Sequence, residues 1–317
     1  MKKGRLLLQI AHSNLDYLRH KKENVIYESR GIFDVNNFPE QIFSPRVEWV
    51  PQNQYYGAER VLRKFAGIQR PLDAFMEHGI QEKGDLEVND IKEYNRKNFI
   101  TFSVFRKEQY EKLIGDNRKI CVVGPYIKYA PLFYSAEEQQ AIKDKYGKIL
   151  TFFPMHTTYG YDATKYDPEF EYVIEQIEKY REQLKVDTVF VCGYWRDYYV
   201  GRLEKYNIND YVMVSAGHGM SQKFLSRLRS IIELSDYTMS DAFGTQVGYS
   251  IGLGVPHIVL EKNGASANHA ANGALDWVLP YVSSYDQFGS KEQIDMMDYV
   301  FGTNQTKSAT ELRKLLR

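Results

Sequence analysis

The feature that most constrains the fold is an alternation of apolar runs and amphipathic helical segments that starts near residue 147. Five runs are almost continuously apolar, as strands buried on both faces of a sheet are. They are "KILTFF", "DTVFVC", "YVMVS", "YTMS" and "PHIVLE". The segments between them carry apolar residues at helical spacing, for example Phe224, Leu228 and Ile231. The alternation predicts a doubly wound α/β domain with a parallel sheet.

The first half of the chain has the same elements in a less regular order. It suggests strands in "RLLLQIA", "LDAFMEHGI", "NFITFSVF" and "KICVVGP", and helices in "GAERVLRKFAGI" and "KEQYEKLIG". The run "RLLLQIA" is followed by polar residues and is too short for a signal peptide or a membrane span, so we expect it to be the first buried strand. Two Rossmann-like domains in tandem would form a ligand cleft between the carboxyl ends of their strands.

The length of 317 residues also favours two domains. We expect residues 1–146 to form the first and residues 147–290 the second, with a linker near residues 143–147. Residues 291–317 are expected to form C-terminal helices that pack back on the first domain, the last of them capped by Ser308.

Composition narrows the class of protein. The 41 basic and 41 acidic residues balance, and no long run of either sign occurs, which argues against a nucleic-acid binder. Cys121 and Cys192 lie inside apolar runs, so we expect two core thiols rather than a disulfide or a metal pair. Metal-binding motifs such as Asp-x-Asp or His-x-x-x-His are absent from the sequence. We therefore expect a cytoplasmic protein without a cofactor or a bound divalent ion.

The stretch "SDAFGTQVGYSIGLGVPHIVLE" begins at Ser240 and carries Gly244, Gly248 and Gly252 every four residues. Each glycine weakens a helix by about 1 kcal/mol relative to alanine, so the repeat needs a reason. One reason is a helix that lies close against the sheet and whose N-terminus, near Thr245, binds an anion through free N–H groups and the helix dipole. Close packing and a cap without a ligand are the alternative.

This stretch resembles, without a gap, the donor-binding signature of GT-B glycosyltransferases, with matches at Asp241, Phe243, Gly244 and Pro256. The retaining families have glutamates at the positions of Asp241 and Tyr249, which argues against retaining chemistry here. The pattern "GTQVGYSIGLGVPHI" looks closer to bacterial surface-polysaccharide transferases, which lack that glutamate pair.

Other segments resemble such a transferase less specifically. "FFPMHTT" corresponds to a loop at the donor phosphates, "SAGHGMS" to a segment that touches the nucleotide, and "AFMEHGI" and "KICVVGPYI" to strand ends of the N-terminal domain. The resemblance and the strand-end positions together suggest a set of donor-binding residues. These are His156, Thr157, Arg196, His218, Gly219, Ser240, Asp241, Gly244 and Thr245. Arg196 has a plain alternative as a solvent-exposed turn residue.

Glycosyl transfer with inversion needs a base that deprotonates the acceptor hydroxyl, and in GT-B enzymes it comes from the N-terminal domain. His78 is the first candidate because it ends an apolar strand directly before a glycine, with Glu77 and Asp85 as carboxylate alternatives. Glu77 should point to the other side of the strand and could simply be solvated. His12, at another expected strand end, is a weaker candidate, whereas His20 and His257 fit ordinary surface and core positions.

The sequence thus predicts an inverting, metal-independent glycosyltransferase that moves a sugar from a nucleotide-sugar donor to a glycan or lipid-linked glycan acceptor. Its second domain would bind the donor, and the loop around Asn268 and His269 would either close over it or be a surface connection. Peripheral contact with the inner face of the cell membrane and the oligomeric state stay open.

The alternative functions are a glycerol-phosphate-type transferase, a GT-B nucleotide-sugar epimerase, a dinucleotide-dependent oxidoreductase, and a non-catalytic nucleotide-binding module. The oxidoreductase ranks low because no complete G-x-G-x-x-G occurs.

Overall fold

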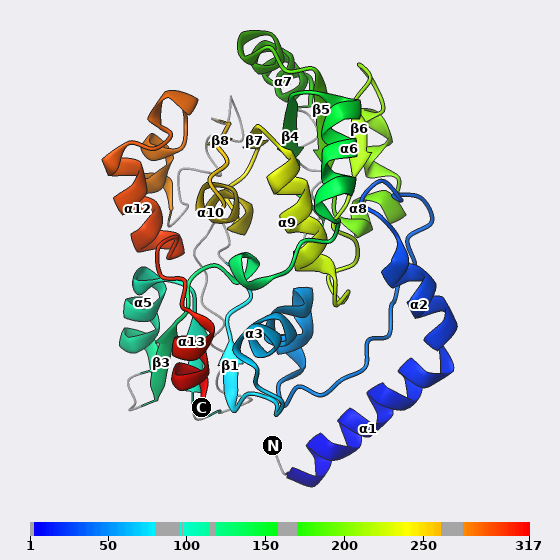
Figure 1. The fold of residues 1–317 in the computed structure, drawn as a ribbon, viewed down its shortest axis with the longest axis vertical. Coiled ribbons are helices and arrows are strands. Elements are labelled where there is room, and N and C mark those ends of the chain that lie inside the picture. The colour runs from blue at the N-terminus through cyan, green and yellow to red at the C-terminus, as the bar shows by residue number, and fades with distance from the viewer. Residues whose placement is uncertain (1–2, 80–95, 97, 115–117, 158–169, 261–274) are drawn as a thin grey trace.

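The computed structural model describes residues 3–79, 96, 98–114, 118–157, 170–260 and 275–317. In this part of the chain the protein is a mixed α/β structure with two parallel sheets, which confirms the α/β part of the predicted fold class. Figure 1 shows the smaller sheet below the larger one, with the two N-terminal helices along one side. That the two sheets form tandem Rossmann-like domains stays a prediction.

The larger sheet has five parallel strands in the order β6-β5-β4-β7-β8. Its strands are β4 (Ile149–Phe153), β5 (Thr188–Cys192), β6 (Val212–Val214), β7 (Tyr237–Ser240) and β8 (His257–Val259). Counted from β4, the order is 3-2-1-4-5, which matches five of the six strands of a doubly wound nucleotide-binding sheet. The strand order therefore reverses between β4 and β7.

Alternate residues of the larger sheet face two different helical layers, as a strand period of two requires. Leu150 and Phe152 of β4 belong to one core cluster with Val173 and Ile177 of helix α7 (Phe170–Leu184). Ile149 belongs to the second cluster, which also contains residues of α9 (Phe224–Leu234) and α10 (Thr245–Gly252). Helices thus cover both faces, which is why the strands are apolar throughout.

The smaller sheet has three described parallel strands in the order β1-β2-β3. They are β1 (Ala74–Met76), β2 (Asn98–Thr101) and β3 (Lys119–Val122). One face packs on the core that includes α3 (Ala58–Ala66), and the other packs on Tyr110 of α5 (Val104–Ile114). The other helical elements are α1 (Lys3–Arg19), α2 (Lys21–Ser29), η1 (Pro51–Gly57), η2 (Tyr126–Tyr129), α6 (Ala136–Tyr146), α8 (Trp195–Tyr199), η4 (Arg202–Tyr206), η6 (Asp276–Tyr281), η7 (Tyr285–Gln287), α12 (Lys291–Phe301) and α13 (Ala309–Leu316).

The C-terminal helices touch the units of both sheets. Helix α12 packs against both α10 and α5. Helix α13 opens at Ser308 with a capping box and packs on α3, where Arg313 donates a hydrogen bond to the carbonyl of Ala66. Lys119 at the start of β3 also reaches the carbonyl of Leu315, at 2.7 Å. The last segment therefore packs back on the smaller-sheet unit.

Three sequence-based expectations for local structure differ from the observed fold. The segment "RLLLQIA" is part of helix α1 and not a strand, because a short apolar run fits either element and Leu7, Leu15 and Leu18 also match a helical period. Residues 143–147, expected as a linker, are the last turn of α6 and its cap Gly147. The segment expected as one helix, "YYVGRLEKY", is divided into α8 and η4 at Gly201, which has a φ of +73°.

The N-terminal segment after α1 lies on the unit of the larger sheet. The carbonyl of Ile32 accepts a hydrogen bond from the Ser215 N–H at 2.9 Å. Arg227 of α9 is buried and donates to the carbonyls of Glu28 and Arg30, at 3.0 and 3.1 Å. These contacts join the N-terminal segment to the second unit, although the boundaries expected from the sequence assign it to the first.

Candidate functional site

The carboxyl ends of β4 and β7 bring together most of the residues expected to bind a donor. Ligands of open parallel sheets bind where the strand order reverses, because the two following loops diverge there. His156 and Thr157 follow β4, and Asp241, Gly244 and Thr245 follow β7, its neighbour. The structure thus places the two predicted segments side by side at the switch point of the larger sheet.

The loop after β4 is held from both sides. Its Met155 N–H donates to Oδ1 of Asp241 at 2.6 Å, and its Met155 carbonyl accepts from Nη1 of Arg202 at 2.6 Å. The Thr157 N–H donates to the carboxylate of Asp197 at 3.1 Å, and Asp197 also pairs with Arg202 at 3.3 Å. The carboxylate of Asp241 therefore accepts a hydrogen bond from the loop after β4. The resemblance to the donor-binding signature predicted instead that this carboxylate contacts the donor.

Asp197 and Arg202 also shape the candidate site, although the sequence pattern did not single them out. Both are buried, and they connect α8 and η4 to the loop after β4. The sequence offered one signal, since Asp197 stands next to Arg196 in a segment directly after a predicted strand. The pairing with a loop 40 residues away depends on tertiary structure.

The side chains of the first candidate segment differ in their environments. The ring of His156 lies 5.0 Å from the ring of Tyr194, and burial of the imidazole lowers its pKa. Thr157 is buried, and its hydroxyl has no hydrogen-bond partner among the described residues. Arg196 is half-buried in α8. The Thr157 hydroxyl at the switch point is thus one polar group that a bound phosphate could satisfy.

The glycine helix α10 begins with Gly244 as its N-cap, in an extended conformation and without a side-chain cap. A Cβ on Gly248 would lie 2.3 Å from the ring of Phe301 in α12, and one on Gly252 would lie 3.4 Å from Thr303. The prediction that these glycines let the helix approach the sheet is therefore wrong: they admit the C-terminal helix and the residues after it. Gly244 and Thr245, at the start of α10, are partly exposed.

The carboxyl end of β1 meets the start of α10. A Cβ on Gly79 would lie 2.3 Å from Oγ1 of Thr245, so a larger residue at this position would require the threonine side chain to move. Nε2 of His78 lies 2.6 Å from the carbonyl oxygen of Gln52, and because a carbonyl only accepts, this nitrogen carries a proton. The His78 ring also lies edge-on against Tyr55, 5.1 Å between centroids. Gly79, directly after His78, therefore lies against the predicted phosphate site.

Glu77 is buried within the smaller-sheet unit. Its carboxylate accepts hydrogen bonds from Arg106 and from the Thr101 hydroxyl, the latter at 2.6 Å, and from the Tyr110 hydroxyl at 3.2 Å. The alternative of a solvated Glu77 is wrong because the strand's second face is covered by α5. A carboxylate so paired is a structural ion pair rather than an available base. Asp85 lies outside the described residues, as do Asn268 and His269.

His218 is placed in the core rather than at the ligand edge. Its ring stacks on Trp195 with 4.1 Å between centroids, and Nδ1 accepts from the Met220 N–H at 3.1 Å. Nε2 faces the carbonyl of Glu40 at 3.3 Å, so both ring nitrogens are used by the backbone. Burial lowers the pKa of His218 to about 4. Its neighbour Gly219 packs on the hydroxyl of Tyr194, so neither position fits the predicted contact with a nucleotide.

Ser240 is fully buried at the end of β7. Its hydroxyl lies 2.8 Å from the carbonyl of Ala242 and 3.0 Å from Nε2 of His257. The other nitrogen of His257 lies 2.8 Å from the Thr238 hydroxyl, and burial lowers the pKa of this histidine to about 3. Ser240 therefore joins β7 to β8 instead of contacting a donor, and His257 has the core position expected for it. His12 is exposed on α1 rather than at a strand end.

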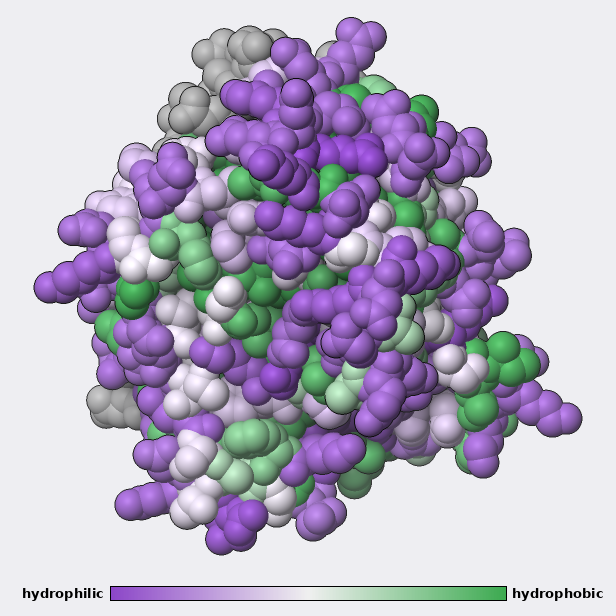
Figure 2. Space-filling view, turned by 45° about the horizontal axis from the view of Figure 1, so that its top comes forward, coloured by the Kyte–Doolittle hydropathy of each residue, from purple (hydrophilic) through white to green (hydrophobic). Residues whose placement is uncertain are grey.

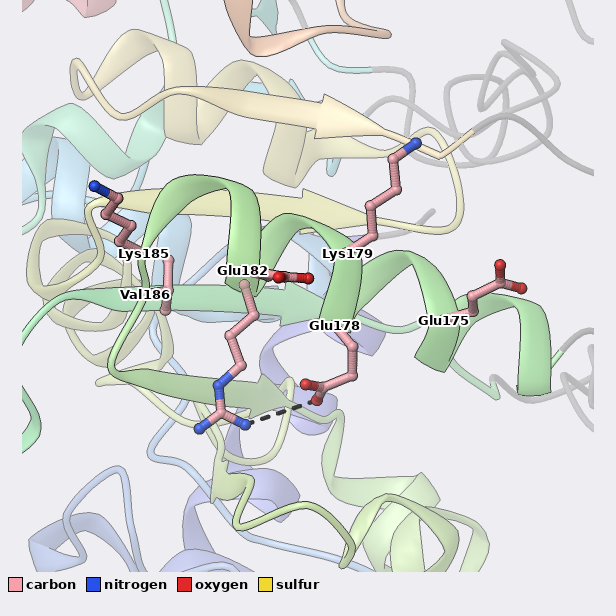
Figure 3. A pocket seen from close by; sticks show the side chains of 7 residues that line it. Glu175, Glu178, Lys179, Glu182, Lys185 and Val186 are labelled. Atoms are coloured by element: carbon pink, nitrogen blue, oxygen red, sulfur yellow. Dashed lines mark ion pairs between the residues drawn. The ribbon is translucent and has the colours of Figure 1, made fainter.

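One surface depression lies away from the switch point. A depression along α7 is lined by charged side chains that include an ion pair between Glu178 and Arg181, and it lies on the outer side of that helix (Figure 3). Over the described ranges, no group of three His, Cys, Asp or Glu side chains could hold a metal ion. Both cysteines are free and buried.

Comparison with known proteins gives only distant structural likenesses. No family model and no curated protein matches the chain. It is similar to sucrose-phosphate synthase from Thermosynechococcus elongatus at 16% identity and a TM-score of 0.31, covering 72% of this chain and 57% of that one. The wall teichoic acid polymerase TagF follows at 12% identity and a TM-score of 0.41, covering 72% and 55%. The N-terminal domain of Candida albicans trehalose-6-phosphate phosphatase has 10% identity and a TM-score of 0.37, covering 76% and 63%.

The first two of these structures are GT-B glycosyltransferases, the class that the sequence stretch around Gly244 resembles. The chain spans little more than half the length of each. Because every TM-score is below 0.5, these likenesses carry no argument about activity. A functional assignment therefore depends on the residues of this chain and their arrangement.

Proposed function

We propose that this protein is an inverting, metal-independent glycosyltransferase that moves a sugar from a nucleotide-sugar donor to a glycan acceptor in surface-polysaccharide synthesis. One observation supports it above the others: Gly79, next to His78 at the end of β1, touches Thr245 at the start of α10. A candidate base on one sheet is thereby next to a candidate phosphate site on the other. The resemblance of residues 240–261 to a donor-binding signature supports the same assignment.

In this proposal the first turn of α10 binds the donor diphosphate. Its backbone N–H groups and helix dipole favour a negative charge, and the Thr245 hydroxyl can donate one further hydrogen bond. The same groups stabilise the nucleoside diphosphate as it leaves. Asp241 contributes by fixing the loop after β4 at Met155, which holds Thr157 at the same edge.

His78 takes the proton of the acceptor. With a proton on Nε2 and a carbonyl in front of it, the nitrogen that can accept a second proton is Nδ1. The acceptor oxygen loses its proton to Nδ1 and bonds to the anomeric carbon, while the bond from that carbon to the diphosphate oxygen breaks on the opposite face. The Gln52 carbonyl then stabilises the imidazolium that forms.

The residues at the two glutamate positions of the retaining families agree with inversion. Asp241 accepts a hydrogen bond from the protein's own backbone, and Tyr249 is buried. Metal independence rests on the absence of an Asp-x-Asp motif from the sequence.

Binding is tested first by a thermal-shift screen against UDP-, GDP-, CDP-, CMP- and dTDP-linked sugars, with NAD as the comparison. A ligand at 100 times its dissociation constant should add about 2.7 kcal/mol of stability. Stabilisation by NAD alone would refute the proposed function.

The donor site is tested with Gly244→Val and Thr245→Ala. Gly244 has an extended backbone that valine can adopt, and the nearest atoms to a new Cβ belong to the movable Gln246 side chain, so the fold should survive. The valine should abolish nucleotide binding in calorimetry by blocking approach to the helix N-terminus. Thr245→Ala should weaken binding by about 1 kcal/mol, the value of one hydrogen bond. An unchanged affinity of the valine variant would move the phosphate site elsewhere.

The base is tested with His78→Ala. Donor affinity should stay near wild type, because His78 acts on the acceptor, while turnover falls by about a hundredfold to ten-thousandfold. His12→Ala, at an exposed position on α1, is the matched control and should keep full turnover. Full activity of His78→Ala with the native acceptor would show that the base is another group.

A further inference from the structure

The N-terminal helix α1 exposes an apolar face that no described part of the chain covers. Leu7, Leu8, Leu15 and Leu18 are 51%, 65%, 51% and 61% exposed. Their spacing places all four within about a third of the helix circumference. Figure 2 shows a face on which hydrophilic groups predominate, with apolar groups between them and a protruding apolar group at the right edge. Four leucines aligned on one helix are therefore a feature that calls for a partner.

Contacts of the neighbouring side of the helix hold α1 against the protein. The Asn14 side chain donates to the carbonyl of Arg46 at 2.8 Å and accepts from the Arg46 N–H at 2.9 Å. Ile10 and Tyr17 lie on this same, half-buried side. At the end of the helix, the ring of His20 stacks on Phe43 with 4.3 Å between centroids. These contacts hold α1 against the protein with its leucines outward.

The N-terminal 23 residues, which include α1, are rich in positively charged side chains. The first 23 residues contain six lysines and arginines against two acidic residues, although the whole chain is balanced. Arg19, Lys21 and Lys22 are exposed where α1 meets α2, and His12 is exposed beside the leucines. An apolar stripe bordered by cations is the pattern of a helix that lies in a membrane interface.

We propose that the leucine face of α1, made of Leu7, Leu8, Leu15 and Leu18, docks on an anionic lipid surface. The leucines would enter the boundary between headgroups and acyl chains, and the cations beside them would contact the headgroups. A second copy of this chain fits less well, because two such faces would bring their own cations together. The mode is attachment in the plane of the surface, since no described helix has both the length and the apolar character to cross a bilayer. This surface is independent of the sugar transfer proposed above.

The experiment is co-sedimentation of the full chain with vesicles of phosphatidylcholine and phosphatidylglycerol in equal parts, and with vesicles of phosphatidylcholine alone. We expect binding to the mixed vesicles and at least about tenfold weaker binding to the neutral ones, because each cation near an anionic surface contributes about 1 kcal/mol. Leu8→Gln/Leu15→Gln/Leu18→Gln should weaken binding to the mixed vesicles by about a hundredfold or more. The matched control, Val200→Gln/Ile208→Gln, removes exposed apolar side chains of the larger-sheet unit and should bind as wild type does.

A second variant keeps the test independent of any folding defect. Lys21→Glu/Lys22→Glu changes two exposed charges and no apolar side chain, and it should weaken binding to the mixed vesicles by at least about tenfold. Vesicle binding that is absent in wild type, or unchanged in the leucine variant, overturns the proposal. Light scattering tests the alternative occupant, a second copy of this chain. If wild type is a dimer, the leucine variant is a monomer and neither binds vesicles, the leucine face mediates self-association and the proposal is overturned.

Discussion

Acidification should destabilise the protein through His218, because this histidine is neutral in the folded state. Its pKa is lowered from 6.5 to about 4 by burial beside Trp195. Between these values the unfolded chain binds a proton that the folded chain does not, so stability is lost as the pH falls through this window. From pH 7 to pH 5 the lost free energy of unfolding is about 2 kcal/mol for this one group.

Two other buried groups act in the same pH range. His257, with a pKa lowered to about 3 by burial, adds a loss of similar size and sign. Glu59 opposes it, because burial raises its pKa to about 7 and its neutral form therefore gains stability as the pH falls. The change in the free energy of unfolding between pH 7 and pH 5 therefore has to be compared between wild type and a His218 variant, because the total change in wild type includes all three groups.

The assay is urea unfolding of wild type and His218→Phe at pH 7 and pH 5. Phenylalanine keeps a ring against Trp195 but cannot titrate, so the loss between the two pH values should be about 2 kcal/mol smaller than in wild type. Phenylalanine also leaves the Glu40 carbonyl and the Met220 N–H without their hydrogen bonds to the ring. This loss should lower the free energy of unfolding by about 1–3 kcal/mol at pH 7. Ile232→Val, a buried and non-titrating change, should lower stability equally at both pH values. An unchanged pH dependence in His218→Phe would refute the structural role of this histidine.

Two further predictions concern packing around the candidate site. Glu77→Gln should destabilise the fold by about 3–5 kcal/mol in urea unfolding, because it leaves Arg106 as a buried charge without its partner; a loss below about 1 kcal/mol would contradict the ion pair. Gly248→Ala should cost about 1–3 kcal/mol because its methyl group meets the Phe301 ring, and Phe301→Leu in the same chain should recover part of this loss. Strict additivity of the two changes would show that the contact is not the cause.

The sequence determined the local elements of the second half with little ambiguity. Strands buried on both faces have to be apolar throughout, and helices that cover them have to carry an apolar stripe, so β4 to β8 and the helices α7, α9 and α10 were visible in the pattern. Ser308 likewise marked the start of α13, because a capping box is a local arrangement of residues. The switch-point segments could be located because they follow strands directly.

Tertiary structure decided which side chains at those positions lie near the candidate site. His78 and His218 both stand at expected strand ends, yet one precedes Gly79, which lies against Thr245, and the other is stacked on Trp195 under the N-terminal segment. That segment could not be placed from its own residues, because a short apolar run such as "RLLLQIA" satisfies a strand or a helix equally. The reason for Gly248 lies in Phe301, more than 50 residues later. Burial and pairing depend on contacts between distant parts of the chain, and a periodic pattern carries information only about neighbours along it.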